Sequence, residues 1–452
     1  MATANGTPGL VSDDPVAENW RECPQCGLIS ALPPMQADRV AVCPRCRHAL
    51  WQMRRHPFEI PIACGVSALL FYCFALVAPF LEISAYGRYQ LASVSTGPAQ
   101  LMAEGYQIVG WLVLATTVIF PGVKLAILLI VLLGLRTRLL PASLLKELFR
   151  WYGPITPWAM IDVYLLGFLV AFTRIVALAS IHLDTALFSL VGVMLAMAAA
   201  DATLDAETVW RALDVADRKA APGKAEQGHH PIRMSSTGAP LGFIGCHCCD
   251  LVNRAEPGER CRRCGVVLHR RKHDSINRSG ALLVAAAVLY FPANIYPIMT
   301  MTEVAVAHPY TIMGGIVDLY EAGLWPLAAL VFFASFTVPM MKIITLGCLL
   351  AQTQIGSAKH LPGRTTAYRI IAFVGRWSMI DVFGLSILVA LVQFAQFANF
   401  VAEIGAACFA AVVVLTMFAV DCFDPRLMWD AQNASRMPAD DVGMADVERA
   451  PA

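Results

Sequence analysis

The sequence Phe-Pro-Gly-Val-Lys at positions 120–124 lies inside a long apolar run, and Val-Pro-Met-Met-Lys at positions 338–342 repeats its Pro-x-x-Lys spacing inside another. A Met-Ile-Asp-Val sequence follows each copy and places Asp162 and Asp381 in the next apolar run. An ionisable side chain in a membrane-spanning run is costly unless it is paired or lines a polar cavity. The lysine and the aspartate of the first copy lie at similar depth from the flanking basic residues, so we expect the two side chains to meet.

The composition excludes an ordinary soluble protein. Hydrophobic residues make up 57% of the chain and charged residues 15%, with a mean hydropathy of +0.59, whereas soluble proteins average about 45–50% apolar and 25% charged residues. The net charge is +1 and no basic stripe with interleaved aromatic residues occurs, so we expect no nucleic-acid partner. Residues 1–20 are polar and acidic, unlike a cleavable signal peptide.

Eight apolar runs predict an all-α polytopic membrane protein, because roughly 20 apolar residues cross a bilayer. The runs cover residues 60–83, 106–135, 155–181, 186–200, 281–301, 325–351, 368–397 and 404–423. The intervening composition predicts a disordered N-terminus (1–20), a first zinc ribbon (21–52), a first transmembrane module of four helices (53–210), a linker (211–240), a second zinc ribbon (241–272), a second four-helix module (273–429) and a disordered tail (430–452).

The second half of the chain repeats the first at a nearly constant spacing. The spacing is 218 residues for Cys46 and Cys264, for Pro79 and Pro297, for Pro121 and Pro339, and for Lys124 and Lys342; it is 219 for Asp162 and Asp381, and 220 for Asp201 and Asp421. Because each half has an even number of spans, we expect a parallel repeat. Lys- and Arg-rich connections lie on the side of both termini, the linker and both cysteine groups, and the positive-inside rule places this side in the cytoplasm.

Four cysteines precede the spans of each half. They are Cys23, Cys26, Cys43 and Cys46 in the first half, and Cys246, Cys249, Cys261 and Cys264 in the second. Two Cys-x-x-Cys pairs at such spacing are typical of a zinc ribbon, in which four thiolates bind Zn²⁺ tetrahedrally. The metal replaces a hydrophobic core that so short a segment cannot build. A redox-active dithiol is the weaker interpretation, because it needs one such motif at the start of a helix.

In the second group His247 or Cys248 is an alternative ligand, although the spacing favours Cys246 and Cys249. A site closed by four thiolates has no open position for catalysis. The chain also contains no nucleotide-binding loop of the Walker kind, no Gly-x-Ser-x-Gly and no His-Glu-x-x-His motif. We therefore expect two structural zinc ions and no enzyme activity.

A set of polar residues inside the spans is the candidate functional site. In the second half, Ser335 and Lys342 are seven residues apart and share a helix face, Ser378 and Asp381 are three apart and share another, and Thr416 lies in the last run.

In the first half Thr117 and Lys124 keep the first of these relations, but Ala159 and Ala196 replace the hydroxyl residues 378 and 416. The second half is the more polar, so we place the working site there. The alternative is that each lysine and aspartate form a buried ion pair that only orients two helices. Pro121 and Pro339 are candidate hinges, and simple kinks are an equally good interpretation.

The duplicated cysteine group, the four spans, the Pro-x-x-Lys sequence and Trp-x-Met-Ile-Asp-Val together resemble the paraquat-inducible protein A family over roughly residues 21–430. The resemblance implies an integral inner-membrane protein of Gram-negative bacteria. It also implies a tetraspanin-like four-helix bundle in each module, a cytoplasmic zinc ribbon for each, and a role for Ser335, Lys342, Ser378, Asp381 and Thr416 as a polar network in the second bundle.

The resemblance further implies transport of phospholipid between the inner and outer membranes with a periplasm-spanning MCE-domain tunnel protein, and hence a part in cell-envelope integrity. The hypothesis is a subunit that loads lipid into the tunnel or extracts it. Two other hypotheses are a scaffold that anchors the MCE partner without transporting lipid, and a membrane protein that senses metal or redox state through its ribbons.

Overall fold

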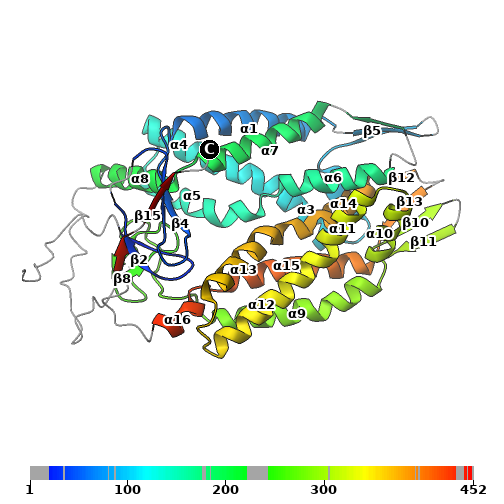
Figure 1. The fold of residues 1–452 in the computed structure, drawn as a ribbon. Coiled ribbons are helices and arrows are strands. Elements are labelled where there is room, and N and C mark those ends of the chain that lie inside the picture. Colours follow the sequence, from blue (N-terminus) through cyan, green and yellow to red (C-terminus); the bar gives the residue numbers. More distant parts are fainter. Residues whose placement is uncertain are drawn as a thin grey trace, which may run out of the picture.

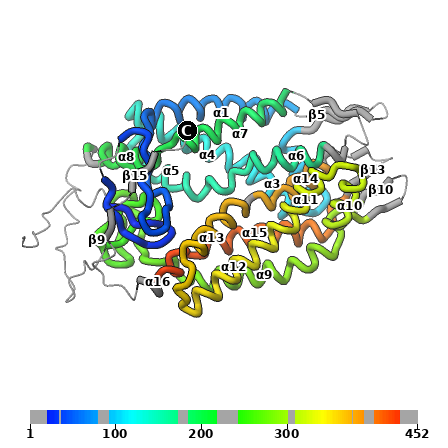
Figure 2. The backbone as a smooth tube through the Cα atoms, in the orientation of Figure 1, coloured from blue at the N-terminus to red at the C-terminus, as the bar shows by residue number. Residues whose placement is uncertain are grey.

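The computed structural model describes residues 20–449 apart from 34–35, 80, 86–87, 176–179, 184, 221–242, 304–305, 392, 395–397, 434–441 and 445. Long helices form the middle of an elongated molecule, with the cysteine-rich strands at one end and further strands at the other (Figure 1). The backbone path shows the helices of the first half lying beside those of the second (Figure 2). Eight helical segments of the described chain are long and apolar enough to cross a membrane, which confirms the predicted helical membrane protein.

The four candidate spans of the first half cover Glu59–Val77, Gln107–Thr137, Ala142–Phe172 and Thr185–Thr203. Their helices are α1 (Glu59–Val77), α3 (Gln107–Leu114), α4 (Phe120–Thr137), α5 (Ala142–Ile155), α6 (Ile161–Ile175) and α7 (Thr185–Thr203). Short helices α2 (Thr96–Ala103) and α8 (Ala206–Ala220) precede α3 and follow α7. Helix α1 packs along α7 and α4.

The second half has the same order of elements. Its candidate spans cover Ser275–Ile295, Trp325–Gln354, Leu361–Val389 and Ile404–Asp430. Its helices are α9 (Ser275–Ile295), α10 (Ile312–Glu321), α11 (Trp325–Val331), α12 (Val338–Gln354), α13 (Leu361–Val374), α14 (Ile380–Leu391), α15 (Ile404–Cys422) and α16 (Leu427–Asn433). Helix α9 packs along α15, as α1 does along α7.

A π-helical segment interrupts the second span of each half, at Ala115–Ile119 between α3 and α4 and at Phe332–Thr337 between α11 and α12. Pro121 and Pro339 follow directly, in the first turn of α4 and of α12. Proline lacks an amide N–H and its ring clashes with the preceding turn, so a wider turn just before it relieves the conflict. The sequence predicted one bent helix in each case, and the hinge role of the two prolines stays a prediction.

Both sheets at the end opposite the cysteines are built from the connections between spans. Strand β5 (Leu81–Ala85) pairs with β6 (Arg88–Ala92) and β7 (Ser180–Leu183), and β10 (Met299–Glu303) pairs with β11 (Val306–Tyr310) and β13 (Ala398–Ala402), which also pairs with β12 (Gln393–Phe394). All of these pairs are antiparallel. Each sheet ties the first and third connections of its own half together.

The cysteine-rich segments form short antiparallel hairpins. The first contains β1 (Trp20–Glu22) with β2 (Ile29–Ala31) and β3 (Arg39–Val42) with β4 (Ala49–Gln52), and the second contains β8 (Phe243–Gly245) with β9 (Val252–Arg254). Strands β14 (Val442–Met444) and β15 (Asp446–Arg449) add to β2 and β3. Residues 442–449 were expected to be disordered; their pairing uses backbone groups that the edges of the short hairpins leave open.

Helix α8 corrects the predicted start of the linker. The linker was expected from residue 211, but α8 continues to Ala220 because its apolar side packs on α5, where the Trp210 ring lies 5.1 Å from Phe149. On the same helix Asp214 and Asp217 lie 3.3 and 2.7 Å from the Lys146 ammonium. The remaining predicted linker, residues 221–240, lies outside the described residues.

The two halves meet where α6 crosses α14 and α2 packs on α14. A Cβ atom at Gly167 would lie 2.9 Å from the Ile380 carbonyl oxygen, and one at Gly97 would lie 2.5 Å from that of Ser386. Small residues allow membrane helices to approach this closely, and packing then replaces the hydrophobic effect as the force between them. The interface between the halves is therefore built from close backbone contact.

Each cysteine-rich segment packs beneath the helices of the other half. Cys23, Cys26 and Cys43 share a buried cluster with side chains of α12, α13 and α15, while Cys246, Cys249 and Cys261 share one with side chains of α4, α5 and α8. The Arg369 guanidinium on α13 donates to the Cys46 carbonyl oxygen at 3.0 Å. Neither half is therefore complete without a segment from the other.

Buried charges join the crossed segments to each other. The Glu207 carboxylate on α8 receives Arg21 from the first segment, Arg263 from the second at 3.0 Å, and Arg211 from its own helix at 2.7 Å. Glu22 accepts from the Arg426 guanidinium at 2.8 Å and from the Gly245 amide at 2.7 Å. A buried charge that loses its partner is strongly destabilising, so these contacts fix how the two segments sit.

Candidate functional site

The four Cys-x-x-Cys motifs fold into the same tight turn. In each, the residue after the second cysteine has a positive φ: 73° at Gly27, 54° at Arg47, 55° at Asp250 and 74° at Gly265. The amide of that residue donates to the carbonyl oxygen of the first cysteine of its motif, at 2.8–3.0 Å. A left-handed residue is needed because the chain must reverse around the two thiols, and glycine adopts this conformation without strain. The turn directs both thiols of a motif to one point.

The four thiols of the first segment meet in one cluster. The Cys23 and Cys46 sulfurs are 3.4 Å apart, the Cys26 and Cys43 sulfurs are 3.6 Å apart, and all four lie within 4.8 Å of one another. Tetrahedral coordination at about 2.3 Å from zinc separates sulfurs by about 3.8 Å, so the cluster fits such an ion.

The second cluster consists of Cys246, Cys249, Cys261 and Cys264. The Cys246 and Cys264 sulfurs are 3.4 Å apart, and the Cys249 and Cys261 sulfurs are 3.6 Å apart. His247 instead contacts the His269 carbonyl oxygen and the Arg426 guanidinium, both at 3.2 Å from Nε2. Cys248 is not in the cluster, and its amide donates to the Cys246 sulfur. The geometry favours the four cysteines that the spacing favoured.

A salt bridge closes the polar network of the first half. The Lys124 ammonium lies 2.5 Å from an oxygen of Asp201 on α7, and the Tyr152 hydroxyl donates to the other oxygen at 2.7 Å. The predicted partner was Asp162, for which the described residues show no ion pair. Asp162 occupies the first turn of α6, where an acidic residue is stabilised by the helix dipole. The predicted pair of Lys124 with Asp162 is therefore replaced by the pair of Lys124 with Asp201.

In the second half, no such salt bridge at Lys342 is found among the described residues. The Lys342 side chain is 1% exposed, and its ammonium donates to Thr416 at 2.9 Å and to Ser378 at 3.3 Å. The acidic side chain whose charge acts on it is Asp421, the repeat equivalent of Asp201. A Cβ atom on Gly375 would lie 2.9 Å from Lys342 Cε, so a larger residue there would displace the end of the lysine side chain.

Three predicted members of this network come together and two do not. Lys342, Ser378 and Thr416 are in contact, but no contact joins Asp381 or Ser335 to Lys342 in the part of the chain described. Asp381 starts α14, as Asp162 starts α6, and is favoured there by the same helix dipole. The alternative in which Lys342 and Asp381 form an ion pair is not seen among the described contacts, and a role of Asp381 in transport stays a prediction.

Ser335 and Thr117 are fully buried within the two π-helical segments. The Thr117 hydroxyl donates to the Val113 carbonyl oxygen at 2.7 Å, whereas the Ser335 hydroxyl has no hydrogen-bond partner among the described residues. Because a π turn contains one extra residue, the side chains before it are rotated about the helix axis by about 100° relative to their positions in a continuous α-helix. The seven-residue spacing from Ser335 to Lys342 therefore does not bring their polar atoms together.

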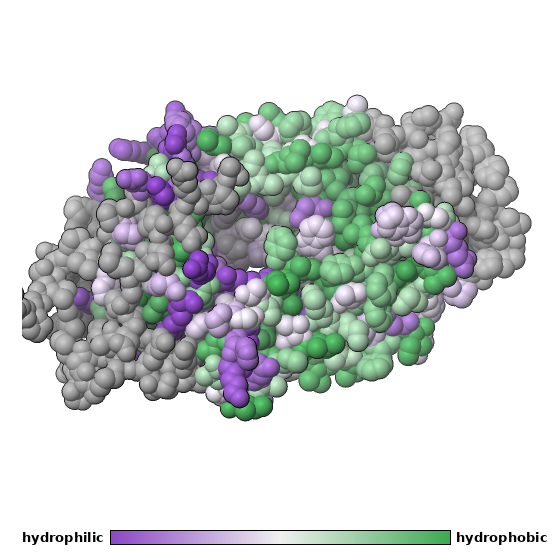
Figure 3. Space-filling view, viewed as in Figure 1, coloured by the Kyte–Doolittle hydropathy of each residue, from purple (hydrophilic) through white to green (hydrophobic). Residues whose placement is uncertain are grey.

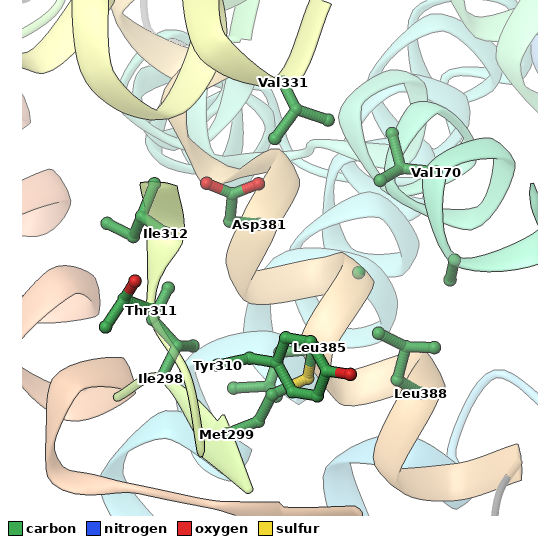
Figure 4. Close-up of a pocket in the computed structure, with 12 residues that line it drawn as sticks. Val170, Ile298, Met299, Tyr310, Thr311, Ile312, Val331, Asp381, Leu385 and Leu388 are labelled. Atoms are coloured by element: carbon green, nitrogen blue, oxygen red, sulfur yellow. The ribbon is translucent and has the colours of Figure 1, made fainter. Parts of the chain in front are cut away.

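Asp381 lines a pocket of about 50 Å³ where the two halves meet. Its carboxylate points between Ile312 and Val331, with Val170 of the first half facing them across the pocket (Figure 4). The other walls are mostly apolar. A volume of this size holds a few water molecules, so the pocket is too small for a lipid in this conformation.

Breaking the ion pair of the first half tests the corrected assignment. We expect Asp201→Asn to lower the free energy of unfolding by about 2 kcal/mol, because the Lys124 ammonium would stay buried without its anion; the full cost of about 3–5 kcal/mol is reduced since Asp201 is 37% exposed. Asp162→Asn is the matched control, with an expected change below about 0.5 kcal/mol. Thermal unfolding in detergent measures both, and equal losses would contradict the assignment.

The fold and the site define a class: a helical membrane protein with eight candidate spans, polar side chains buried between them, and two four-thiol clusters at one end. The model of the paraquat-inducible protein A family matches residues 58–214 and 276–433. The chain belongs to this family, as its sequence indicated. The two matches correspond to the two sets of four spans.

Named relatives agree with this assignment along nearly the whole chain. The chain is 31% identical over 413 residues to intermembrane transport protein PqiA of Escherichia coli (strain K12), covering 91% of this chain and 96% of the relative. It is 29% identical over 425 residues, 94% of each chain, to lipophilic envelope-spanning tunnel protein A of the same strain. A probable intermembrane transport protein of Haemophilus influenzae is 26% identical over 413 residues, 90% of this chain and 94% of the relative. No solved structure matches the chain.

Proposed function

We propose that this protein is the inner-membrane component of a phospholipid transport system of a Gram-negative cell, and that it passes lipid to or from a periplasm-spanning MCE-domain tunnel. The names of its relatives support transport between membranes. The positive-inside pattern supports a cytoplasmic location for both termini and the cysteine clusters. In this arrangement the sheets built from β5–β7 and β10–β13 face the periplasm, where the partner binds.

The observation that carries the proposal is the link between Lys342 and the interface of the two halves. Ser378 binds the Lys342 ammonium, and Asp381, one helical turn further on, lines the pocket between the halves. A charge deep in a membrane protein without a salt bridge is expensive and marks a functional position. Movement of α14 against α6 would change the pocket and the contacts of Lys342 together. We propose that lipid enters by this opening and that Lys342 attracts its phosphate.

The two four-cysteine clusters are proposed to hold one structural Zn²⁺ each, since closed tetrathiolate sites are typical of zinc ribbons. Bound zinc would fix the four knuckle turns, and the buried arginine and glutamate contacts would transmit that order to the helices. With tetraspanin-like bundles in a parallel repeat, these ribbons complete the proposed architecture. A role in catalysis is not proposed for either cluster.

Site-specific photo-crosslinking to phospholipid tests the proposed entry route. A photoreactive residue at Leu388, in the pocket, is expected to form a lipid adduct in cells that contain the MCE partner. The same residue at Leu128, 1% exposed in the core of the first half, is the control and should form none. An adduct at neither position, with normal expression and co-purification of the MCE partner, would favour the scaffold hypothesis and overturn lipid entry here.

A further inference from the structure

A second, larger groove lies at the connection between α12 and α13, away from the interface of the halves. Its volume is about 610 Å³. Its walls are formed by Thr345, Cys348, Gln352, Lys359, His360 and Arg364, with apolar side chains between them. Hydrophilic surface gathers at this end of α12, directly beside the hydrophobic surface of the spans (Figure 3).

The groove is positively charged, and no carboxylate of the described residues pairs with its cations. Lys359 and His360 are exposed, and the Arg364 guanidinium is held by the Ser357 carbonyl oxygen at 2.6 Å and the Ser357 hydroxyl at 2.9 Å. No aspartate or glutamate occurs in the sequence between Glu321 and Asp381. Among the described contacts none joins these cations to an acidic group. Arg364 is 9% exposed and is oriented by neutral oxygens, so no acidic group among the described contacts offsets its charge.

In the first half, the residue equivalent to Arg364 is a lysine that forms salt bridges with two aspartates. Lys146 precedes Arg364 by 218 residues, the spacing of the repeat. Its ammonium lies 2.7 Å from Asp217 and 3.3 Å from Asp214, both on α8. The helix that follows the last span of the second half, α16, ends at Asn433 after seven residues. Among the described residues, none of the second half therefore pairs with Arg364 as Asp214 and Asp217 of α8 pair with Lys146.

The groove lies at the ends of two candidate membrane spans, where the surface of a membrane is expected. The span containing α12 ends at Gln354 and the span containing α13 begins at Leu361, so the charged residues of the groove lie between two span ends. Along the same two helices Ile344, Ile370 and Phe373 expose about half or more of their side chains. A ligand with an anionic head and apolar chains would meet complementary groups along its whole length. Basic pockets of this kind between membrane helices bind anionic lipid head groups.

We propose that the α12–α13 groove binds the phosphate of an anionic phospholipid from the leaflet on the side of the cysteine clusters. Lys359 and Arg364 contact the phosphate, and the acyl chains lie on the exposed apolar faces of α12 and α13. The site is separate from the pocket at Asp381 and does not depend on lipid transport. It would hold a lipid whether the protein transports lipid or only anchors its partner.

Binding of phosphatidylglycerol to the full-length protein, measured by native mass spectrometry in detergent, tests the proposal. We expect tighter binding of phosphatidylglycerol than of phosphatidylcholine, and about a fivefold loss of phosphatidylglycerol affinity in Lys359→Gln, with a larger loss in Lys359→Glu. Residue 359 is exposed, so neither variant should unfold the protein. Thermal unfolding of each variant checks this directly.

The control variant is Arg136→Gln, which removes an exposed cation from the last turn of α4, next to the corresponding connection of the first half. It should leave phosphatidylglycerol binding within twofold of the wild type. An equal loss in both variants would mean that only diffuse surface charge attracts the lipid, and would overturn the proposal. So would equal binding of the two lipids, or displacement of phosphatidylglycerol by inorganic phosphate at a similar concentration, which would indicate a site for a soluble anion.

Discussion

Lys342→Met should abolish the proposed lipid transport while leaving the protein as heat-stable as the wild type. The Lys342 ammonium is buried with two hydroxyl groups and no salt bridge, so burial of its charge is only partly compensated. Replacing a poorly compensated buried charge by an apolar side chain of similar volume is often neutral or stabilising. Outer-membrane integrity in a complementation assay and thermal unfolding of the purified protein measure the two effects.

Lys124→Met is the matched control in the first half. It removes the cation from a closed salt bridge and leaves the Asp201 carboxylate and the Tyr152 hydroxyl without it. We expect this variant to lose stability and the Lys342 variant to lose function. Normal transport by the Lys342 variant would show that the network of the second half only holds helices together, and a matching loss of stability in both variants would show the same.

Cys26→Ser should remove one of the two proposed zinc ions and destabilise the whole protein. Structural zinc sites contribute on the order of 10–16 kcal/mol of apparent binding free energy to the segments they fold. The loss should extend to the second half, because Cys26 shares a buried cluster with side chains of α12, α13 and α15. Metal content by mass spectrometry and limited proteolysis at the α12–α13 connection measure the two consequences.

Cys348→Ser is the control for the cysteine variant, since Cys348 is exposed and outside both clusters. It should retain two zinc ions and wild-type resistance to protease. The same measurement with and without oxidant separates a structural ribbon from a redox sensor. Reversible release of zinc by mild oxidant would favour the sensor, and unchanged zinc content would exclude it.

The spans and both cysteine clusters followed from the sequence because each depends on local information. A run of apolar residues or a Cys-x-x-Cys spacing is recognised within one segment of the chain. The repeat spacing also identified Asp201 and Asp421 as equivalent positions of the two halves. Ser378 and Thr416 were predicted to lie with Lys342, but the Asp201 partner of Lys124 was missed and no described contact joins Asp381 or Ser335 to Lys342, because these contacts depend on the rotation of one helix against another. The π-helical segments change that rotation, and no residue pattern in the sequence predicted them.

The location of the ribbons was also beyond a reading of the sequence. Order along the chain suggested that each ribbon serves the spans that follow it, whereas the side chains around Cys23 and Cys246 come from the opposite half. The residues that join each segment to the opposite half are single charged residues far apart in sequence. Arg369 binds the Cys46 carbonyl oxygen, and Glu207 binds Arg263. Only the folded chain shows which of many such residues meet.

The crossed ribbons also bear on how a duplicated chain of this kind arises. A single-copy ancestor with one cysteine-rich segment and four spans could reproduce this crossed packing only together with a second molecule. Two such chains would satisfy each other by exchanging ribbons across a twofold axis, which is a low-cost route to a dimer. Joining the two genes would then preserve the exchange within one polypeptide. On this view the described chain is a tethered dimer whose two copies have since diverged, one retaining the Lys124–Asp201 ion pair and the other leaving its lysine among hydroxyls.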